Sequence, residues 1–378
     1  MSQPLKIPFF DYRRLFTDHH DELLKIIDEV SSRGAFIMQK ELKEFELELA
    51  QFTSSNFTVG VGNATDGLEL AWLAVGLKPG DEVIISAHTM VATASAIVTA
   101  GGRPIPVDIG EDNLIDANAI ERAINSRTVG ISPTHLNGRT CNMERILQIA
   151  NKNNLVVIED SAQALGSKFD DKHAGTFGLS GSFSFYPAKV LGGIGDGGAV
   201  ITNSRDHFEA LYQLHDHGRD EDGEVKRWGR NSRLDNVNAA LLLYKLHSYD
   251  SVIKRRRQIA QMYQDRLGQV EFLRLPPSPN SNPRHFDVYQ NYELEAESRD
   301  QLQVYLASEG VGTLVQWGGK AIHHFKNLGF KVALPRTDEF FRKCLMLPMN
   351  VFISDSDVDL ISEKIIEFYA RHFKRGLN

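Results

Sequence analysis

The sequence predicts an α/β fold in which a mostly parallel central sheet, flanked by helices, is followed by a smaller C-terminal α+β domain. Two observations lead to this prediction. Short apolar runs rich in β-branched residues alternate with helical or turn-rich stretches from residue 57 to residue 202. After residue 203 the pattern changes, and helical periodicity dominates.

The apolar runs indicate strands that are buried on both faces, because a parallel sheet covered by helices leaves its strands no polar face. The stretch 65–75 has the apolar spacing of a helix and directly follows the first run, so it predicts a strand, turn and helix unit. The predicted strands are residues 57–61, 82–86, 103–107, 128–133, 155–159, 181–185 and 198–202.

The remainder of the chain carries a second set of elements. The proline-rich run 275–283 cannot continue a helix, because proline lacks the amide hydrogen and clashes with the preceding turn. We place the domain boundary at residue 247, with a large domain of residues 1–247 and a small domain of residues 248–378. The expected elements are helices at 205–215, 234–244, 248–268 and 355–373, and strands at 287–294 and 312–317.

Charge and cysteine content exclude several classes of protein. The formal net charge is -7, and the basic and acidic residues are mixed, so no basic stripe is available to follow a nucleic-acid backbone. Cys141 and Cys344 lie far apart without metal-ligand spacing, so we expect neither a disulfide nor a metal site. No apolar run reaches about 18 residues. We therefore expect a cytoplasmic protein without a membrane partner.

The segment 156–163 (Val-Val-Ile-Glu-Asp-Ser-Ala-Gln) is an apolar strand that ends in acidic residues. The carboxyl ends of parallel strands open onto the ligand crevice, and a carboxylate there faces a ligand. Asp160 is therefore a candidate functional residue. The alternative is that Asp160 caps a following helix, which is a common use of aspartate after a strand.

A lysine follows another predicted strand. Lys189 ends the stretch 182–189 and precedes the glycine-rich stretch 192–198. Such a turn can hold an ammonium group away from bulk water, and desolvation lowers its pKa toward the neutral nucleophile that Schiff-base chemistry needs. The alternative is a solvated lysine beside a flexible loop.

The turn 62–67 (Gly-Asn-Ala-Thr-Asp-Gly) opens a helix with small residues and a hydroxyl group. Free backbone N–H groups and the positive end of the helix dipole converge there, which suits a phosphate. Gly60 and Gly62 have the spacing that begins a dinucleotide-binding turn, but the third glycine is missing because residue 65 is Thr. Together with the lysine and the acid, this turn favours a phosphorylated cofactor.

On these segments the chain resembles the DegT/DnrJ/EryC1/StrS family of sugar aminotransferases, within the fold-type I (aspartate aminotransferase-like) pyridoxal-phosphate enzymes. The similarity runs from about residue 10 to residue 246 and is weaker in the small domain. The matching motifs include Gly60-Val61-Gly62-Asn63-Ala64-Thr65-Asp66, His135-Leu136-Asn137-Gly138, Glu159-Asp160-Ser161-Ala162-Gln163-Ala164, Ser184-Phe185-Tyr186-Pro187-Ala188-Lys189, Gly195-Asp196-Gly197-Gly198-Ala199 and Asn231-Ser232-Arg233-Leu234-Asp235.

The resemblance implies a role for each matching residue. Lys189 would carry pyridoxal 5'-phosphate as a Schiff base and move the proton during transfer, and Asp160 would pair with the pyridinium nitrogen. The other implied contacts are Gln163 at the ring 3-oxygen and Ala64, Thr65 and Ser184 at the phosphate. Asn231 would reach the phosphate of the neighbouring subunit's cofactor, which implies a homodimer with shared active sites.

Several positions depart from the family pattern. Met90 stands where the family usually has an aromatic ring over the pyridine, so stacking would come from the Met90 thioether or from a neighbour such as His88. Met38 and Gln39 stand where a glycine is common.

Four residues are expected near the substrate. Gln316 and Trp317 replace the usual His-Tyr pair of the small domain. His135 and Asn137 follow another strand and would border the substrate pocket, and the alternative for this pair is ordinary strand-end polarity.

The resemblance implies amino transfer from glutamate to the keto group of a sugar. It favours a nucleotide-linked keto-deoxysugar, in cell-surface polysaccharide (lipopolysaccharide) or amino-sugar biosynthesis. A keto sugar acid, such as an 8-keto octulosonate, is the alternative substrate. Arginines near residue 231 suit a carboxylate, a diphosphate or glutamate itself, namely Arg219, Arg227, Arg230 and Arg233.

Two further classes remain as alternatives. They are a pyridoxal-phosphate-dependent sugar dehydratase, in which the family has histidine in place of the lysine, and a non-catalytic regulatory homologue. The apolar run 239–243 also predicts that the helix 234–244 packs against a partner subunit. The alternative is a helix buried within its own subunit.

Overall fold

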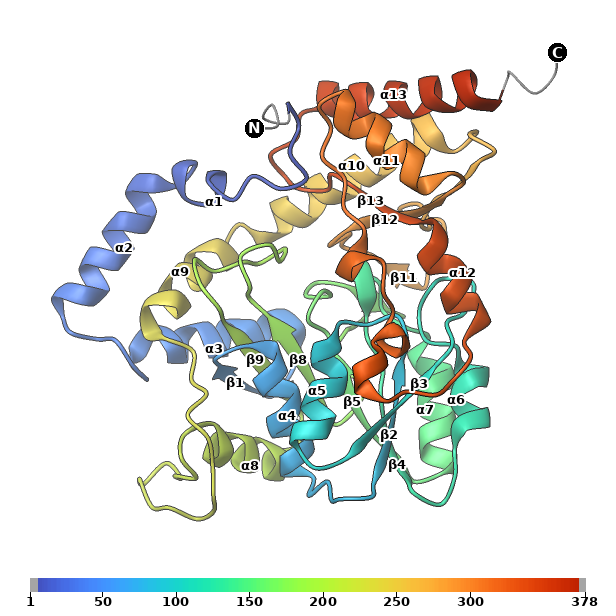
Figure 1. Ribbon diagram of the computed structural model, residues 1–378. Helices are drawn as coiled ribbons and strands as arrows, with labels where there is room; N and C mark the ends of the chain where they lie inside the picture. Colours follow the sequence, from blue (N-terminus) through green and yellow to red (C-terminus); the bar gives the residue numbers. More distant parts are fainter. Residues whose placement is uncertain (1–5, 374–378) are drawn as a thin grey trace.

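A seven-stranded sheet forms the centre of the larger part of the molecule (Figure 1). The computed structural model describes residues 6–373. The strand order is β1-β9-β8-β5-β4-β2-β3, and only β9 runs antiparallel to its neighbours. The strands are β1 (Phe57–Val61), β2 (Glu82–Ser86), β3 (Arg103–Val107), β4 (Thr128–Ser132), β5 (Val156–Asp160), β8 (Ser180–Ser184) and β9 (Gly198–Thr202). The predicted α/β fold with a mostly parallel sheet is confirmed.

Helices cover both faces of this sheet, which explains why its strands are mostly apolar. In β2, Val83 and Ile85 join the core beneath α4 and α5, whereas Ile84 joins the core beneath α6 and α7. Alternate residues of a strand point to opposite faces, so both faces need apolar side chains. The helices are α1 (Arg14–Thr17), α2 (His20–Ser32), α3 (Lys40–Thr53), α4 (Ala64–Ala74), α5 (Val91–Thr99), α6 (Ala117–Ala123), α7 (Met143–Lys152), α8 (Arg205–His215) and α9 (Asn236–Leu246).

Glycines let the beginning of α4 approach the sheet closely. A Cβ atom at Gly198 of β9 would lie 2.6 Å from the carbonyl carbon of Asn63 and 2.7 Å from the nitrogen of Ala64. A Cβ atom at Gly67 would lie 2.5 Å from Ser182 Oγ. Because larger residues are excluded at these two positions, the first turn of α4 rests directly on β8 and β9.

The C-terminal part has its own core. Residues of α10 and α13 pack with β12 and β13 and with Ile7 from the N-terminal segment. Tyr249 and Ile253, at the start of α10, instead join the core of α3 and α9, so α10 spans both parts. The boundary at residue 247 stays a prediction. The elements are α10 (Tyr249–Leu267), β10 (Leu273–Arg274), β12 (Tyr292–Ala296), α11 (Arg299–Ser308), α12 (Pro335–Lys343), β13 (Cys344–Leu347) and α13 (Asp355–Phe373).

The strands of the C-terminal part form a three-stranded sheet of order β10-β12-β13, and a further small sheet joins the two parts. In its order β11-β6-β7, the strand β11 (His285–Phe286) of the C-terminal part pairs with β6 (Lys168–Phe169), which pairs with β7 (Lys172–His173).

Two strand predictions in this part were wrong. The strand predicted at 287–294 begins only at Tyr292, because residues 287–291 turn toward the large sheet and bond to its loops. The segment 312–317 forms one isolated bridge between Leu314 and Met346 and then a short 3-10 turn, in which Trp317 has a left-handed φ of 47°. The sequence pattern also did not predict the strand β13, which pairs with β12.

The prediction that the apolar run 239–243 faces a partner subunit is corrected by the structure. Ala239, Leu241 and Leu242 are fully buried within the single chain, where α9 packs against α3. Asn236 anchors the start of α9, because its amide accepts from the Leu42 N–H at 2.8 Å. The apolar character of this helix therefore reflects the subunit's own core. Within residues 6–373, no helix combines the length and the apolar character that crossing a membrane requires.

Candidate active site

A cavity of about 800 Å³ opens where the carboxyl ends of β4, β5 and β8 meet the C-terminal part. This is the edge at which a parallel sheet offers its ligand crevice. The N-terminal segment also contributes to the lining, through Phe9, Phe10 and Tyr12. Seven of the eight residues predicted to contact the cofactor line this cavity, namely Ala64, Thr65, Met90, Asp160, Gln163, Ser184 and Lys189.

Lys189 enters the cavity from the turn that follows β8. Its backbone N–H donates to the Tyr186 carbonyl at 2.8 Å. Burial lowers the pKa of the Lys189 ammonium to about 8, while the Asp160 carboxylate acts in the opposite direction. A lysine with such a pKa has a larger neutral fraction near neutrality, and the neutral amine is the nucleophile. The structure therefore favours the nucleophilic reading of Lys189 over a solvated surface lysine.

Asp160 ends β5 with its side chain at the cavity and is only 4% exposed. Its Oδ2 accepts from the Thr93 hydroxyl at 2.6 Å, and its Oδ1 accepts from the Ala162 N–H at 3.2 Å. No helix directly follows Asp160 in the described chain, so it is not a helix cap. Thr93 was not among the predicted site residues, because its contact with Asp160 spans distant parts of the sequence.

The first turn of α4 offers backbone donors to the cavity. Asn63 caps the helix, because its Oδ1 accepts from the Asp66 N–H at 2.9 Å. Helix geometry leaves the N–H groups of Ala64 and Thr65 without an intrahelical acceptor. Ser184, at the end of β8, lines the same cavity. These donors and the positive end of the helix dipole suit a phosphate group.

Met90 lies at the cavity, but His88 does not. Met90 is 45% exposed, and its Sδ accepts from the Ala92 N–H at 3.0 Å, which caps α5. His88 is 1% exposed, its Nδ1 donates to the Asn113 carbonyl at 2.9 Å, and its ring packs against Phe340. His88 is thus enclosed behind the cavity wall, and the suggestion that it stacks on a cofactor was wrong.

His135 does not border the cavity, which corrects the sequence prediction. Its side chain is fully buried, and its Nε2 lies 2.7 Å from the Glu159 carboxylate. Its Nδ1 accepts from the Cys141 N–H at 3.1 Å, so the proton is on Nε2 and is donated to Glu159. His135 therefore ties together the ends of β4 and β5.

Asn137 does not line the cavity, but bonds to residues that do. Its φ of 57° is left-handed, and its backbone N–H donates to Gln163 Oε1 at 2.8 Å. The Asn137 side chain bonds to Glu293, Gln316 and Asn291. Both Gln316 and Trp317 line the cavity, as their predicted place near the substrate requires.

Asn231 is exposed and does not line the cavity of its own chain. The next residue, Ser232, accepts from the Gly62 N–H at 3.1 Å and donates to Asp66 at 2.7 Å, so the segment lies beside the first turn of α4. Of the four arginines near this segment, Arg230 pairs with Glu69 and Arg233 pairs with Asp216. None of the four lines the cavity.

One group of side chains in residues 6–373 has the spacing of metal ligands, namely His323, His324 and Asp338. Asp338 Oδ1 lies 2.8 Å from His323 Nε2 and 2.7 Å from His324 Nε2. The Ala321 N–H donates to His324 Nδ1 at 3.1 Å, which places the proton of neutral His324 on Nε2. Because that nitrogen is a donor, the group is explained as a hydrogen-bonded cluster, and we propose no metal there.

The groups around the cavity fit pyridoxal 5'-phosphate. A helix N-terminus suits its phosphate, a buried carboxylate suits its ring nitrogen, and a desolvated amine suits its reactive carbon. The mostly parallel sheet with this set of groups at its carboxyl edge defines a fold-type I pyridoxal-phosphate-dependent transferase.

The chain belongs to the DegT/DnrJ/EryC1/StrS aminotransferase family, whose model matches residues 17–366. It is a pyridoxal-phosphate-dependent aminotransferase. A pleiotropic regulatory protein of Geobacillus stearothermophilus is 35% identical over 98% of this chain and 100% of its own length. The dTDP-3-amino-3,4,6-trideoxy-alpha-D-glucose transaminase of Streptomyces venezuelae is 33% identical over 97% of both chains. The crystal structure of S. venezuelae DesV superposes with a TM-score of 0.92 at 31% identity, covering 97% of this chain and 99% of DesV.

Proposed function

We propose that this enzyme moves an amino group from glutamate to the keto group of a nucleotide-linked deoxyhexose, as a step in amino-sugar or cell-surface polysaccharide biosynthesis. The observation that carries the proposal is Lys189, with its lowered pKa, beside Asp160 in a cavity of about 800 Å³. A cavity of this size holds a drug-sized ligand. The Streptomyces venezuelae relative is named for a dTDP-linked sugar with its amino group on carbon 3, which supports carbon 3 as the site of transfer.

The residues divide the chemistry between them. Bound pyridoxal phosphate supplies an electron sink and carries the amino group between the two substrates. Asp160 would hold the proton on the ring nitrogen, and Gln163 would donate to the ring 3-oxygen. Lys189 would move the proton at the reacting carbon through Nζ, since a pKa of about 8 lets it give and take protons near neutral pH. Ala64, Thr65 and Ser184 would bind the phosphate.

The other classes lack a supporting observation. Lys189 stands where the related dehydratases have histidine, which argues against sugar dehydration. One relative is named a regulatory protein, but this chain keeps both the lysine and the buried acid that catalysis needs. A keto sugar acid without a nucleotide also lacks support, because the relatives that are named for their substrates are named for dTDP- or UDP-linked sugars.

We also propose a homodimer with shared active sites. Asn231 is exposed and does not line the subunit's own cavity, while Trp228, three residues earlier, is 98% exposed. Tryptophan is enriched at protein–protein interfaces relative to the rest of the protein surface. A second copy of the chain would cover Trp228 and receive Asn231.

The function is tested with purified enzyme and cofactor. The visible absorption of the bound cofactor should fall when L-glutamate is added. The reverse direction then uses a dTDP-linked 3-amino-3-deoxyhexose with 2-oxoglutarate, and mass spectrometry should show the keto sugar nucleotide. Absence of a spectral response to every amino donor would contradict aminotransfer, whereas a response to glutamate with turnover only of 8-amino-octulosonate would replace the nucleotide sugar with the sugar acid.

A further inference from the structure

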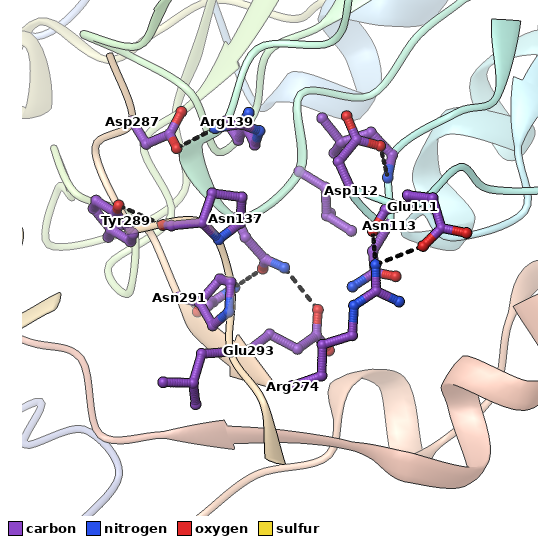
Figure 2. A pocket seen from close by; sticks show the side chains of 15 residues that line it. Glu111, Asp112, Asn113, Asn137, Arg139, Arg274, Asp287, Tyr289, Asn291 and Glu293 are labelled. Atoms are coloured by element: carbon purple, nitrogen blue, oxygen red, sulfur yellow. Dashed lines mark hydrogen bonds and ion pairs between the residues drawn. The ribbon is translucent and has the colours of Figure 1, made fainter. Parts of the chain in front are cut away.

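A wall of polar side chains separates the active-site cavity from a smaller pocket of about 180 Å³, which Figure 2 shows from close by. The wall consists of Glu293, Asn137, Gln316 and Asn291, and we call it the amide wall. Gln316 and Asn291 line the active-site cavity, whereas Glu293 and Asn137 line only the smaller pocket.

Glu293 accepts hydrogen bonds from two of the amide side chains in the amide wall. Its side chain is 2% exposed. Its Oε2 accepts from Asn137 Nδ2 at 2.6 Å and from Gln316 Nε2 at 2.9 Å. A carboxylate has acceptor oxygens but no N–H, so each amide must turn its NH2 group toward Glu293.

The orientation of the Asn137 amide then determines how the side chains of Asn291 and Gln316 are oriented. Because Asn137 points Nδ2 at Glu293, its Oδ1 faces the remaining members and accepts from Asn291 Nδ2 and Gln316 Nε2, both at 2.8 Å. Gln316 Nε2 thus gives both of its hydrogens to the wall. In Figure 2, Asn137 lies between Asn291 and Glu293, with dashed lines to both.

The cavity side of the amide wall is left with acceptors. Among residues 6–373, no protein group donates to Gln316 Oε1 or to Asn291 Oδ1, and both residues line the cavity. Asn137 also orients the amide of Gln163, which faces the cofactor side with its NH2 group instead of its oxygen. Its backbone N–H bonds to Gln163 Oε1 at 2.8 Å, which leaves the NH2 group of Gln163 as the free donor.

We infer that Glu293 sets the hydrogen-bond polarity of the substrate-facing amides, so that Gln316 and Asn291 present carbonyl oxygens to the substrate. The inference rests on the proposed function and narrows its substrate class. The part of the sugar against this wall offers O–H or N–H donors, such as ring hydroxyls. A carboxylate or phosphate has no hydrogen to donate to the two carbonyl oxygens, so it gains no hydrogen bond at this wall.

The test uses Glu293→Leu, Glu293→Gln and Gln316→Met in the cofactor-loaded enzyme, with Glu295→Gln as the matched control. Glu295 lies two residues along the same strand and pairs with Arg274 and Arg336, outside the cavity. The KM of the dTDP-linked 3-amino-3-deoxyhexose should rise about tenfold for Glu293→Leu and Gln316→Met, the effect of losing roughly one hydrogen bond. Glu293→Gln keeps one acceptor oxygen and should have a smaller effect. The control should keep the KM of the unaltered enzyme.

Two readouts separate polarity from a general structural role. The L-glutamate concentration that half-saturates the spectral response should change less than the sugar KM, because glutamate carboxylates have no hydrogen to donate to the carbonyl oxygens of the amide wall. Neutron diffraction of the unaltered enzyme should show both Gln316 Nε2 deuterons directed at Glu293 and Asn137. The inference would be overturned if the Gln316 deuterons faced the cavity. It would also be overturned if the sugar KM stayed within twofold of that of the unaltered enzyme in Gln316→Met and in the folded Glu293 variants. Failure of the unaltered enzyme to respond to L-glutamate would instead overturn the proposed function and the inference with it.

Discussion

Gln290 holds the backbone on both sides of Lys189. Its Nε2 donates to the Ala188 carbonyl at 2.9 Å, and its Oε1 accepts from the Val190 N–H at 2.8 Å. Gln290 is 7% exposed and lies between β11 and β12 in the C-terminal part. One side chain of that part therefore sets the position of the lysine that the large sheet supplies.

Gln290→Leu should slow the covalent attachment of the cofactor to Lys189. Leucine has a similar size but leaves the Ala188 carbonyl and the Val190 N–H unpaired, at about 1–3 kcal/mol for each buried group. The measurement is the rate of absorbance change when cofactor is mixed with the cofactor-free variant. Gln261→Leu, an exposed position on α10, is the control. Attachment at the unaltered rate would show that other contacts place the lysine.

Lys189→Ala should abolish transamination while the fold and part of the cofactor affinity remain, because Asp160 and the first turn of α4 are untouched. Turnover is measured with the sugar nucleotide, and cofactor binding by equilibrium dialysis. Circular dichroism checks the fold. Full turnover by this variant would refute the assignment of Lys189.

Asp160→Asn should retain the cofactor but lose rate by about 100-fold or more, because a neutral amide no longer holds the proton of the ring nitrogen. Thr93→Val removes only the hydroxyl that donates to Asp160 at 2.6 Å, so the loss should be about tenfold. Comparing kcat at neutral pH for the two variants tests this order. An unchanged rate in Asp160→Asn would mean that another acid serves the ring.

The stability of the cofactor-free chain should rise with pH between about 8 and 10.5. Burial lowers the pKa of Lys189 from 10.5 to about 8, so in this window the unfolded chain binds more protons than the folded one. Folding then becomes more favourable as pH rises. Urea unfolding at several pH values should show this rise. Lys189→Met should reduce the rise to the part that comes from Lys245, whose pKa burial also lowers to about 8. Parallel curves for the two proteins would indicate that the lysine is solvated.

A mixture of Lys189→Ala and Asn231→Leu chains should recover about a quarter of the unaltered activity if the dimer shares its sites, given random assortment. Half of the dimers are then mixed, and one of their two sites contains both Lys189 and Asn231. Light scattering confirms the dimer, and mass spectrometry of differently labelled chains confirms subunit exchange. If activity stays at the level of the separate variants after exchange, Asn231 does not serve the partner's site.

The sequence alone determined the sheet and the centre of the site. The apolar runs predicted β1 to β5, β8 and β9 to within about one residue, because strands buried on both faces are mostly apolar. Lys189 and Asp160 were found because each directly follows or ends such a strand, where parallel sheets open their crevice.

Only the tertiary structure decided which polar residues reach the cavity. His135 and Asn137 follow the same strand as their motif predicts, yet His135 bonds to Glu159 and Asn137 turns into the amide wall. The apolar run of α9 looked like an interface but fills the subunit's own core. Thr93, Gln290 and Glu293 act through partners 67, 100 and 156 residues away, respectively. Hydrogen bonds between such distant residues form only after the chain has folded, so no local sequence pattern predicts them.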